Sequence, residues 1–329
     1  MKVSIFGVGA VAGLAGARMA RSGMDGLSFV ARGAHLDAIR RKGLTVREQS
    51  GEWTVPVHAT GDTASLGVQD VVIMGLKAHT IAAALDQVAP LIGPDTVIVP
   101  TLNGIPWWYF HGLPGDWPKR HLDSVDPGGR IWRALGPERA LGCVVYIGSN
   151  IPEPGTIEHN NGGIYVIGEP DHSKSDRAAR VAALFTAGGL RSHVADDIHA
   201  EVWGKLWGNL TGNPLSVLCR AGCDALVIDR DVGQVMTDMM REAASVAAAN
   251  GCTAGPDIEE KLDSFLRLGP IKSSMLQDFE AGKTIELDAL LGVVGELGRL
   301  AGIATPKCDL IYALTRLAAT LAGCYTPPR

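Results

Sequence analysis

The sequence has little of what marks a nucleic-acid-binding, metal-binding or membrane-spanning protein. Its 329 residues carry 30 Lys and Arg against 35 Asp and Glu, a formal net charge of -5. There is no block of like charges, which argues against a nucleic-acid partner bound through a basic surface. The six cysteines are scattered without C-x-x-C pairs or metal-ligand spacing, so we expect reduced thiols and no metal site. The ligand should be a small molecule.

Long apolar runs are also missing. No run reaches about 18 residues, the length at which a membrane-spanning helix becomes possible. The stretch from Lys2 to Ala17 has some features of a secretory signal peptide, but glycines interrupt it and Arg18 and Arg21 follow. This order suits a strand, a tight turn and an amphipathic helix. We therefore expect a cytoplasmic protein with no membrane partner.

Two kinds of pattern divide the chain near residue 196. Before it, short β-branched runs alternate with helical patterns, as in parallel strands joined by crossover helices. Buried parallel strands are predicted at residues 3–6, 27–31, 71–76 and 96–99. Runs at 141–147, 156–159 and 164–168 predict an antiparallel extension that closes the same sheet. The first domain, residues 1–196, is thus predicted to be α/β.

Beyond residue 197, strand-like alternation gives way to apolar residues at helical spacing. Helices are predicted at 198–218, 230–250, 258–266, 274–281, 286–301 and 306–322. At 46% hydrophobic residues, the chain can form two sizeable cores. We expect an all-α second domain over residues 197–329.

A glycine-rich turn follows the first predicted strand and opens a helix. It reads G-x-G-x-x-A and consists of Gly7, Val8, Gly9, Ala10, Val11 and Ala12. In this context the motif binds a dinucleotide. The first glycine permits the turn, and the second lets the pyrophosphate approach backbone amides at the positive end of a helix. The first domain is therefore predicted to be a Rossmann domain, doubly wound with a mostly parallel sheet.

Two basic residues bear on which dinucleotide binds. Arg32 follows the second predicted strand, where NAD enzymes usually have a carboxylate, and an arginine there accommodates the 2′-phosphate of NADP. A solvated surface arginine is the alternative. Lys77 follows the strand at 71–76, at the sheet edge where ligands bind, although an ordinary loop lysine fits equally. The sequence favours NADPH.

One predicted helix carries a polar stripe. Lys205, Asn209 and Asn213 recur at i, i+4 and i+8, while large apolar residues flank them and leave little of the helix free for solvent. Buried polar groups need partners, and Pro214 interrupts the helix beside them. Desolvation would lower the pKa of such a lysine and suit it to donate a proton to a carbonyl oxygen. A solvent-facing stripe is the alternative.

Taken together, the motifs resemble the ketopantoate reductase (2-dehydropantoate 2-reductase) family. They span nearly the whole chain in the right order: residues 7–12, 30–35, 77–78 and 103–104, the Lys205 helix, and 273–278 with Glu286. The resemblance implies NADPH-dependent reduction of a 2-oxo acid, most simply 2-dehydropantoate to pantoate. It implies Lys205 as general acid and Glu286 as a substrate-binding carboxylate. Asn103, Asn209, Asn213 and Ser274 would contact substrate, with Asn103 also beside the cofactor.

Taken alone, three of these residues have plainer explanations. Ser274 fits a helix N-cap, Glu286 fits the positive end of the predicted 286–301 helix, and Asn103-Gly104 fits a turn. Two other readings of function also stay open: the same fold acting on a bulkier 2-oxo acid or forming an opine-like amine, and a non-catalytic NADP-binding sensor. A homodimer is a further possibility.

The chain departs from the family pattern in two places. Ala12 replaces a third glycine, which the fingerprint allows. Residues 106–133 are longer and more aromatic than the usual connection, with Trp107, Trp108, Tyr109, Phe110, Trp117 and Trp132. We hypothesise that Trp107 and Trp108 form a lid over the substrate, with packing on the protein's own surface or in a subunit interface as the alternatives.

Overall fold

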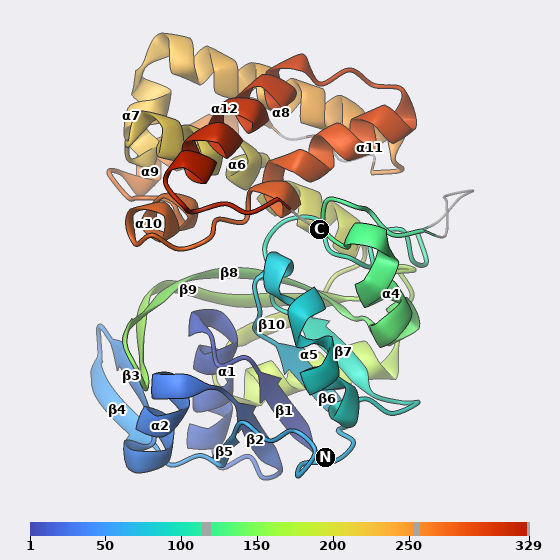
Figure 1. Cartoon of the computed structure of the whole chain (residues 1–329), viewed down its shortest axis with the longest axis vertical. Helices are drawn as coiled ribbons and strands as arrows, with labels where there is room; N and C mark the ends of the chain where they lie inside the picture. The colour runs from blue at the N-terminus through green and yellow to red at the C-terminus, as the bar shows by residue number, and fades with distance from the viewer. Residues whose placement is uncertain (114–119, 253–254, 256, 328–329) are drawn as a thin grey trace. The chain divides into compact units, whose positions relative to one another are not determined.

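The computed structural model describes residues 1–113, 120–252, 255 and 257–327, which form two compact units. Unit 1 comprises Met1–Leu102 and Arg130–Ile198, and unit 2 comprises Asn103–Gly129 and His199–Arg329 (Figure 1). We expected residues 103–129 in the first domain. They belong to unit 2 because their long-range contacts run to its helices, as in the backbone bond from Ile105 N–H to the Ala289 carbonyl.

The first sheet of unit 1 is entirely parallel and has the order β5-β2-β1-β6-β7. Its strands are β1 (Val3–Phe6), β2 (Leu27–Val30), β5 (Ala59–Thr60), β6 (Val71–Met74) and β7 (Val97–Pro100). Strands were predicted at four of these places, and the predictions are confirmed. The order reverses between β1 and β6, and in such sheets ligands bind beyond the carboxyl ends of the strands at this switch point.

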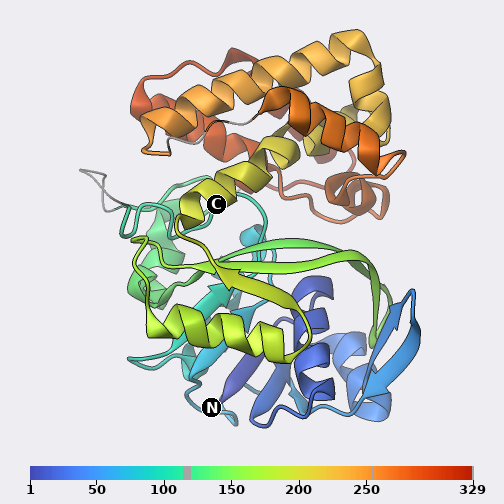
Figure 2. The same ribbon diagram turned by 180° about the vertical axis from the view of Figure 1, so that it is seen from behind.

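The later strands of unit 1 were predicted to extend and close the first sheet. This prediction is wrong, because they form a second sheet. Its strands are β3 (Leu44–Glu48), β4 (Gly51–Val55), β8 (Gly142–Glu153), β9 (Thr156–Gly168) and β10 (Arg191–Val194). The two runs predicted at 156–159 and 164–168 form one strand, β9, which pairs antiparallel with β8 in the long green hairpin of Figure 2. On its other edge, β9 pairs with β3 at one end and β10 at the other.

The helices of unit 1 are α1 (Ala10–Arg21), α2 (Gly33–Lys42), α3 (Leu85–Val88), α4 (Arg130–Leu135) and α5 (Asp176–Ala187). Helix α1 packs against the first sheet on one side and the second on the other. A Cβ on Gly16 would lie 2.6 Å from the Phe29 ring of β2, and one on Gly13 would lie 2.6 Å from Ile157 of β9. The small residues of α1 therefore let two sheets approach one helix.

No strand occurs among the described residues of unit 2, as predicted for the second domain. Its helices are α6 (Ile198–Cys219), α7 (Cys223–Ile228), α8 (Arg230–Ala249), α9 (Ile258–Leu268), α10 (Ser274–Glu280), α11 (Val293–Ala301) and α12 (Pro306–Leu321). Short 3-10 turns in the two units lie at Ala78–Thr80, Ala82–Ala84, Ala89–Leu91, Pro127–Gly129 and Pro137–Arg139. Among the described residues, no helix has the length and apolarity that a membrane span requires.

The helix predicted at 286–301 differs from expectation. Glu286 precedes it, and residues Asp288–Gly292 form a π-helical turn, here called the π-turn, that leads into α11. Single π-turns within helices often occur at functional sites. The short helix α7 was missed, since six residues carry too little periodicity to be detected.

Candidate active site

The glycine-rich turn lies at the switch point of the first sheet. Gly7 has φ +84°, and a Cβ there would lie 2.7 Å from the Leu76 side chain. A Cβ on Gly9 would lie 2.9 Å from the Gly75 carbonyl oxygen, so the turn passes directly beside the end of β6. Gly9 caps α1 without a side chain, and the amides of the first helical turn have no side-chain acceptor there. A pyrophosphate fits this arrangement.

The two basic residues predicted for the cofactor lie in the loops after neighbouring strands. Arg32 follows β2, is exposed and occupies the N-cap position of α2. Lys77 follows β6 and is half-buried, and its carbonyl accepts a hydrogen bond from Thr80 N–H at 2.9 Å. Because β2 and β6 flank β1 in a parallel sheet, both residues lie at the same sheet edge as the glycine turn.

His35 was not singled out from the sequence, although it ends the matched segment 30–35. Its Nδ1 accepts a hydrogen bond from Gly155 N–H at 2.9 Å, which ties α2 to the turn of the β8–β9 hairpin. The nitrogen Nε2 is buried without a hydrogen-bond partner among the described residues. Burial lowers the pKa of His35, opposed by the nearby Val8 backbone, and this favours the neutral imidazole that can accept at Nδ1.

In unit 2, the polar stripe of α6 meets the Asn103 loop. Lys205 and Asn209 are half-buried, and Asn213 is 6% exposed. Lys205 Nζ donates to Asn103 Oδ1 at 2.7 Å across 102 residues of sequence. The Nδ2 donor of Asn213 is buried without an acceptor in the part of the chain that the structure describes. A buried orphan donor is costly, so this amide suits an acceptor carried by a ligand.

Glu286 is half-buried and lies two residues before the π-turn, which the loop containing Asn103 contacts. The Ala289 carbonyl of the π-turn accepts Ile105 N–H at 3.0 Å. Gly104 has φ +84°, and a Cβ on it would lie 2.1 Å from the Ala289 oxygen. The loop therefore rests directly on the segment that carries Glu286.

The serine segment requires one correction. Ser273, not Ser274, caps α10, and its Oγ accepts Leu276 N–H at 3.1 Å. Ser273 Oγ also lies 2.6 Å from Ser216 Oγ, and Ser216 donates to the Asn213 carbonyl at 2.7 Å. Ser274 is the exposed first residue of α10, so its hydroxyl is not used by the cap.

The aromatic residues 107–110 are buried in the structure. Trp107 and Trp108 are 2% and 1% exposed, so they pack within unit 2 and offer almost no surface to a subunit interface, and their role as a lid over the substrate stays a prediction. Trp203 Nε1 of α6 donates to the Tyr109 hydroxyl at 3.0 Å, and His199 Nε2 lies 2.9 Å from the Tyr109 carbonyl. Trp132 lies in α4, and Trp117 is outside the described residues.

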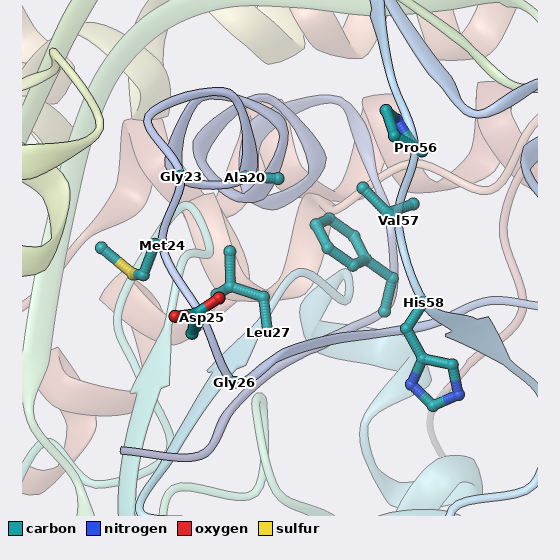
Figure 3. A pocket seen from close by; sticks show the side chains of 10 residues that line it. Ala20, Gly23, Met24, Asp25, Gly26, Leu27, Pro56, Val57 and His58 are labelled. Atoms are coloured by element: carbon teal, nitrogen blue, oxygen red, sulfur yellow. The ribbon is translucent and has the colours of Figure 1, made fainter.

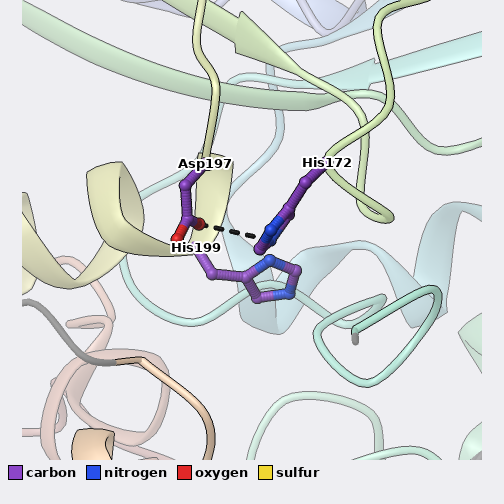
Figure 4. A group of neighbouring side chains, drawn as sticks. All are labelled: His172, Asp197 and His199. Atoms are coloured by element: carbon purple, nitrogen blue, oxygen red, sulfur yellow. Dashed lines mark ion pairs between the residues drawn. The ribbon is translucent and has the colours of Figure 1, made fainter. Parts of the chain in front are cut away.

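Two other features of unit 1 lie apart from these residues. A hollow of about 300 Å³ lies between the end of α1, the start of β2 and residues 56–58 before β5, hence at the amino ends of the strands (Figure 3). His172, which has φ +62°, pairs with Asp197 at 3.2 Å (Figure 4). Neither feature contributes to the predicted site.

Comparison with known proteins identifies the family of the chain. The family model "Ketopantoate reductase PanE/ApbA" matches residues 3–107, and "Ketopantoate reductase PanE/ApbA C terminal" matches residues 197–319. A 2-dehydropantoate 2-reductase of Mesorhizobium japonicum is 43% identical over 99% of this chain and 100% of its own.

Solved structures give the same result. A candidate ketopantoate reductase from Ralstonia solanacearum superposes with a TM-score of 0.94 at 41% identity, covering 98% of this chain and 99% of its own. A 2-dehydropantoate 2-reductase from Geobacter metallireducens has a TM-score of 0.84 at 26% identity, covering 97% and 100%. The chain belongs to the ketopantoate reductase family and is an oxidoreductase that uses a nicotinamide cofactor to reduce a 2-oxo acid to a 2-hydroxy acid.

Proposed function

We propose that the protein reduces 2-dehydropantoate to pantoate with NADPH. The observation that carries the proposal is the pairing of Lys205 Nζ with Asn103 Oδ1 at 2.7 Å in unit 2. A carboxamide oxygen holds the ammonium in one orientation without neutralising its charge, which leaves a proton available for transfer. The relative from Mesorhizobium japonicum, whose similarity covers 99% of the chain, supports this substrate.

The residues of unit 2 have distinct roles in this proposal. Lys205 donates a proton to the oxygen of the 2-oxo group while the bound nicotinamide supplies the hydride, and solvent then reprotonates the amine. Glu286 accepts a hydrogen bond from a substrate hydroxyl. The buried Nδ2 of Asn213 donates to substrate, and Asn209 and Ser274 complete the substrate contacts. Asn103 orients Lys205 and would also contact the nicotinamide of a bound cofactor.

The preference for NADPH rests on the loop after β2. Residues 31–33 are Ala-Arg-Gly and contain no carboxylate to accept hydrogen bonds from the ribose hydroxyls of NAD. The exposed side chain of Arg32 is accessible to a 2′-phosphate, which a guanidinium binds through two parallel hydrogen bonds. Lys77 adds a second positive charge at the same sheet edge. Gly7, Val8, Gly9, Ala10, Val11 and Ala12 would hold the pyrophosphate.

A panel of 2-oxo acids assayed with NADPH and with NADH tests the proposal. We expect the highest kcat/KM with 2-dehydropantoate and NADPH. A higher value with a bulkier 2-oxo acid would transfer the assignment to that substrate, and amine-dependent turnover would indicate an opine-type reaction. NADPH binding with no turnover of any 2-oxo acid would indicate a sensor.

We also propose that the enzyme is a cytoplasmic homodimer that pairs through α12. None of the six cysteines forms a disulfide bond in the structure, which supports a reducing compartment. Four leucines at spacings of four, three and four residues line one face of α12 and are 47–80% exposed: Leu310, Leu314, Leu317 and Leu321. No charged residue interrupts that face, which lies opposite the buried Cys308 and Thr315.

A two-fold antiparallel pair of α12 helices would place Leu310 against Leu321 and Leu314 against Leu317, leucine on leucine throughout. Such a pair buries on the order of 1,000 Å², near the lower limit of specific interfaces, so the dimer should be weak. Sedimentation analysis over a concentration series tests it. Leu314→Glu should shift the protein to monomer, and a wild-type monomer at every concentration would contradict the proposal.

A further inference from the structure

Residues near the C-terminus form hydrogen bonds to the segment that carries Glu286, both before and after that residue. Ile285 N–H donates to the Cys324 carbonyl at 2.9 Å, one residue before Glu286. Two residues after Glu286, Asp288 Oδ1 accepts the Tyr325 hydroxyl at 2.9 Å and the Tyr312 hydroxyl of α12 at 2.7 Å. Cys324 and Tyr325 are buried, at 1% and 7% exposure, so these two residues are part of the packed interior.

The protonation states of this cluster favour the hydrogen bonds. Burial raises the pKa of Tyr312 to about 12 and also raises that of Tyr325, so both phenols keep their protons and donate. Burial also raises the pKa of Asp288, while the two phenols favour its charged form. The hydroxyl oxygens lie 3.3 Å apart and converge on one carboxylate oxygen. Without these donors, the half-buried carboxylate would lose two strong hydrogen bonds.

The same carboxylate begins the π-turn on which the Asn103 loop rests. The next residue, Ala289, accepts Ile105 N–H through its carbonyl, and Gly104 packs against that carbonyl too closely for any side chain. Asn103, one residue earlier, holds Lys205. A continuous path of contacts therefore runs from the end of the chain through Asp288 and Ala289 to the proton donor.

We propose that Asp288, Tyr312 and Tyr325 form a C-terminal clamp that positions Glu286 and Asn103 for catalysis. They are positioning residues, because they act through the π-turn and through residue 285 and not on the substrate itself. The inference rests on the proposed function only for the roles of Glu286, Asn103 and Lys205. The geometry of the clamp can be tested separately.

The test uses Tyr325→Phe, Tyr312→Phe and the double variant in the full-length protein. Each single variant removes one hydroxyl and keeps the ring, so we expect kcat to fall roughly 3- to 10-fold. The double variant leaves Asp288 without either phenol, and we expect roughly a 100-fold fall, since small misplacements of catalytic groups have effects of that size. NADPH affinity, measured by cofactor fluorescence, should fall far less than kcat, because the glycine turn, Arg32 and Lys77 belong to unit 1 and Asn103 is the one cofactor contact proposed in unit 2.

A matched control separates positioning from general loss of stability. Thr315→Val removes a buried hydroxyl from the same helix as Tyr312, where its Oγ1 donates to the Ile311 carbonyl of that helix. All variants are assayed well below their measured Tm. An equal fall in kcat for Thr315→Val and Tyr325→Phe would overturn the proposal. If the double variant does not fold, the two single variants decide.

Crystal structures of the wild type and variants supply a measurement that does not depend on activity. We expect Asn103 Oδ1 to move away from Lys205 Nζ in the double variant, or in both single variants. An unchanged 2.7 Å contact with Glu286 in place would overturn the clamp. If the wild type reduces no 2-oxo acid, the proposed function fails, and the crystal structures still decide whether the clamp positions these residues.

Discussion

Replacing Gly104 with alanine should damage both stability and catalysis. Gly104 has φ +84°, and an alanine Cβ there would lie 2.1 Å from the Ala289 oxygen and 2.6 Å from its carbonyl carbon. Neither atom belongs to a flexible side chain, so the clash is relieved only by moving the loop away from the π-turn. That movement breaks the bond from Ile105 N–H and withdraws Asn103 from Lys205.

Two costs determine how much the free energy of unfolding falls in Gly104→Ala. A second glycine, at which only one of these costs applies, allows them to be measured separately. A left-handed backbone at a residue other than glycine costs about 1–2 kcal/mol. Loss of the Ile105 hydrogen bond adds roughly 0.5–1.5 kcal/mol, so Gly104→Ala should lower the free energy of unfolding by about 1.5–3.5 kcal/mol. Gly128, in the same unit, has φ +66°, and a Cβ on it would have no described neighbour within 4 Å. Gly128→Ala should therefore incur only the backbone cost of about 1–2 kcal/mol.

Urea denaturation followed by circular dichroism measures both free energies, and initial rates with NADPH and the best 2-oxo acid give kcat. We expect Gly104→Ala to lose roughly 100-fold in kcat and Gly128→Ala to stay near wild type, because only the first displaces Asn103. Equal losses of stability in the two variants would show that the close approach to Ala289 carries no cost. Wild-type kcat in a folded Gly104→Ala protein would refute the positioning of Asn103 by this contact.

Four other predictions concern single residues. Lys205→Ala should lower kcat by roughly 100- to 10,000-fold while NADPH still binds, and near-normal turnover would exclude it as the general acid. Arg32→Asp should weaken NADPH binding far more than NADH binding, as measured by titration with each cofactor. Equal losses of affinity for both cofactors would contradict the contact between Arg32 and the 2′-phosphate. Glu286→Gln should raise KM for the 2-oxo acid, and a loss of NADPH affinity instead would show that Glu286 serves the cofactor. Because the pKa of His35 is lowered in the folded state, its contribution to stability is present above the unfolded pKa and lost as the pH falls through the folded value. The Tm of the wild type should thus fall more steeply than that of His35→Gln between about pH 7.5 and about pH 5, and parallel curves would contradict this.

The positions of the residues proposed for the dinucleotide site were largely predictable because their signals are local. The G-x-G-x-x-A turn lies between a strand and a helix that are adjacent in sequence, and parallel strands bring their carboxyl ends to one edge. Arg32 and Lys77 follow strands that were predicted correctly. Their position at the carboxyl edge of the sheet could therefore be predicted as well. His35 was missed because its bond to Gly155 spans 120 residues, and no local pattern indicates such a partner.

The sequence by itself determined the fold class, the helices of the second domain and the polar stripe of α6, since hydrophobic periodicity and the spacing of side chains along one helix are local properties. Only the tertiary structure decided which sheet β8 and β9 join, because strand pairing depends on contacts between distant segments. It also decided that residues 103–129 belong to unit 2, that Ser273 and not Ser274 caps α10, and that Trp107 and Trp108 are buried. The clamp at Asp288 is of the same kind: it joins a π-turn to residues 24 and 37 positions further along the chain, and such an arrangement follows from packing and not from any pattern in the sequence.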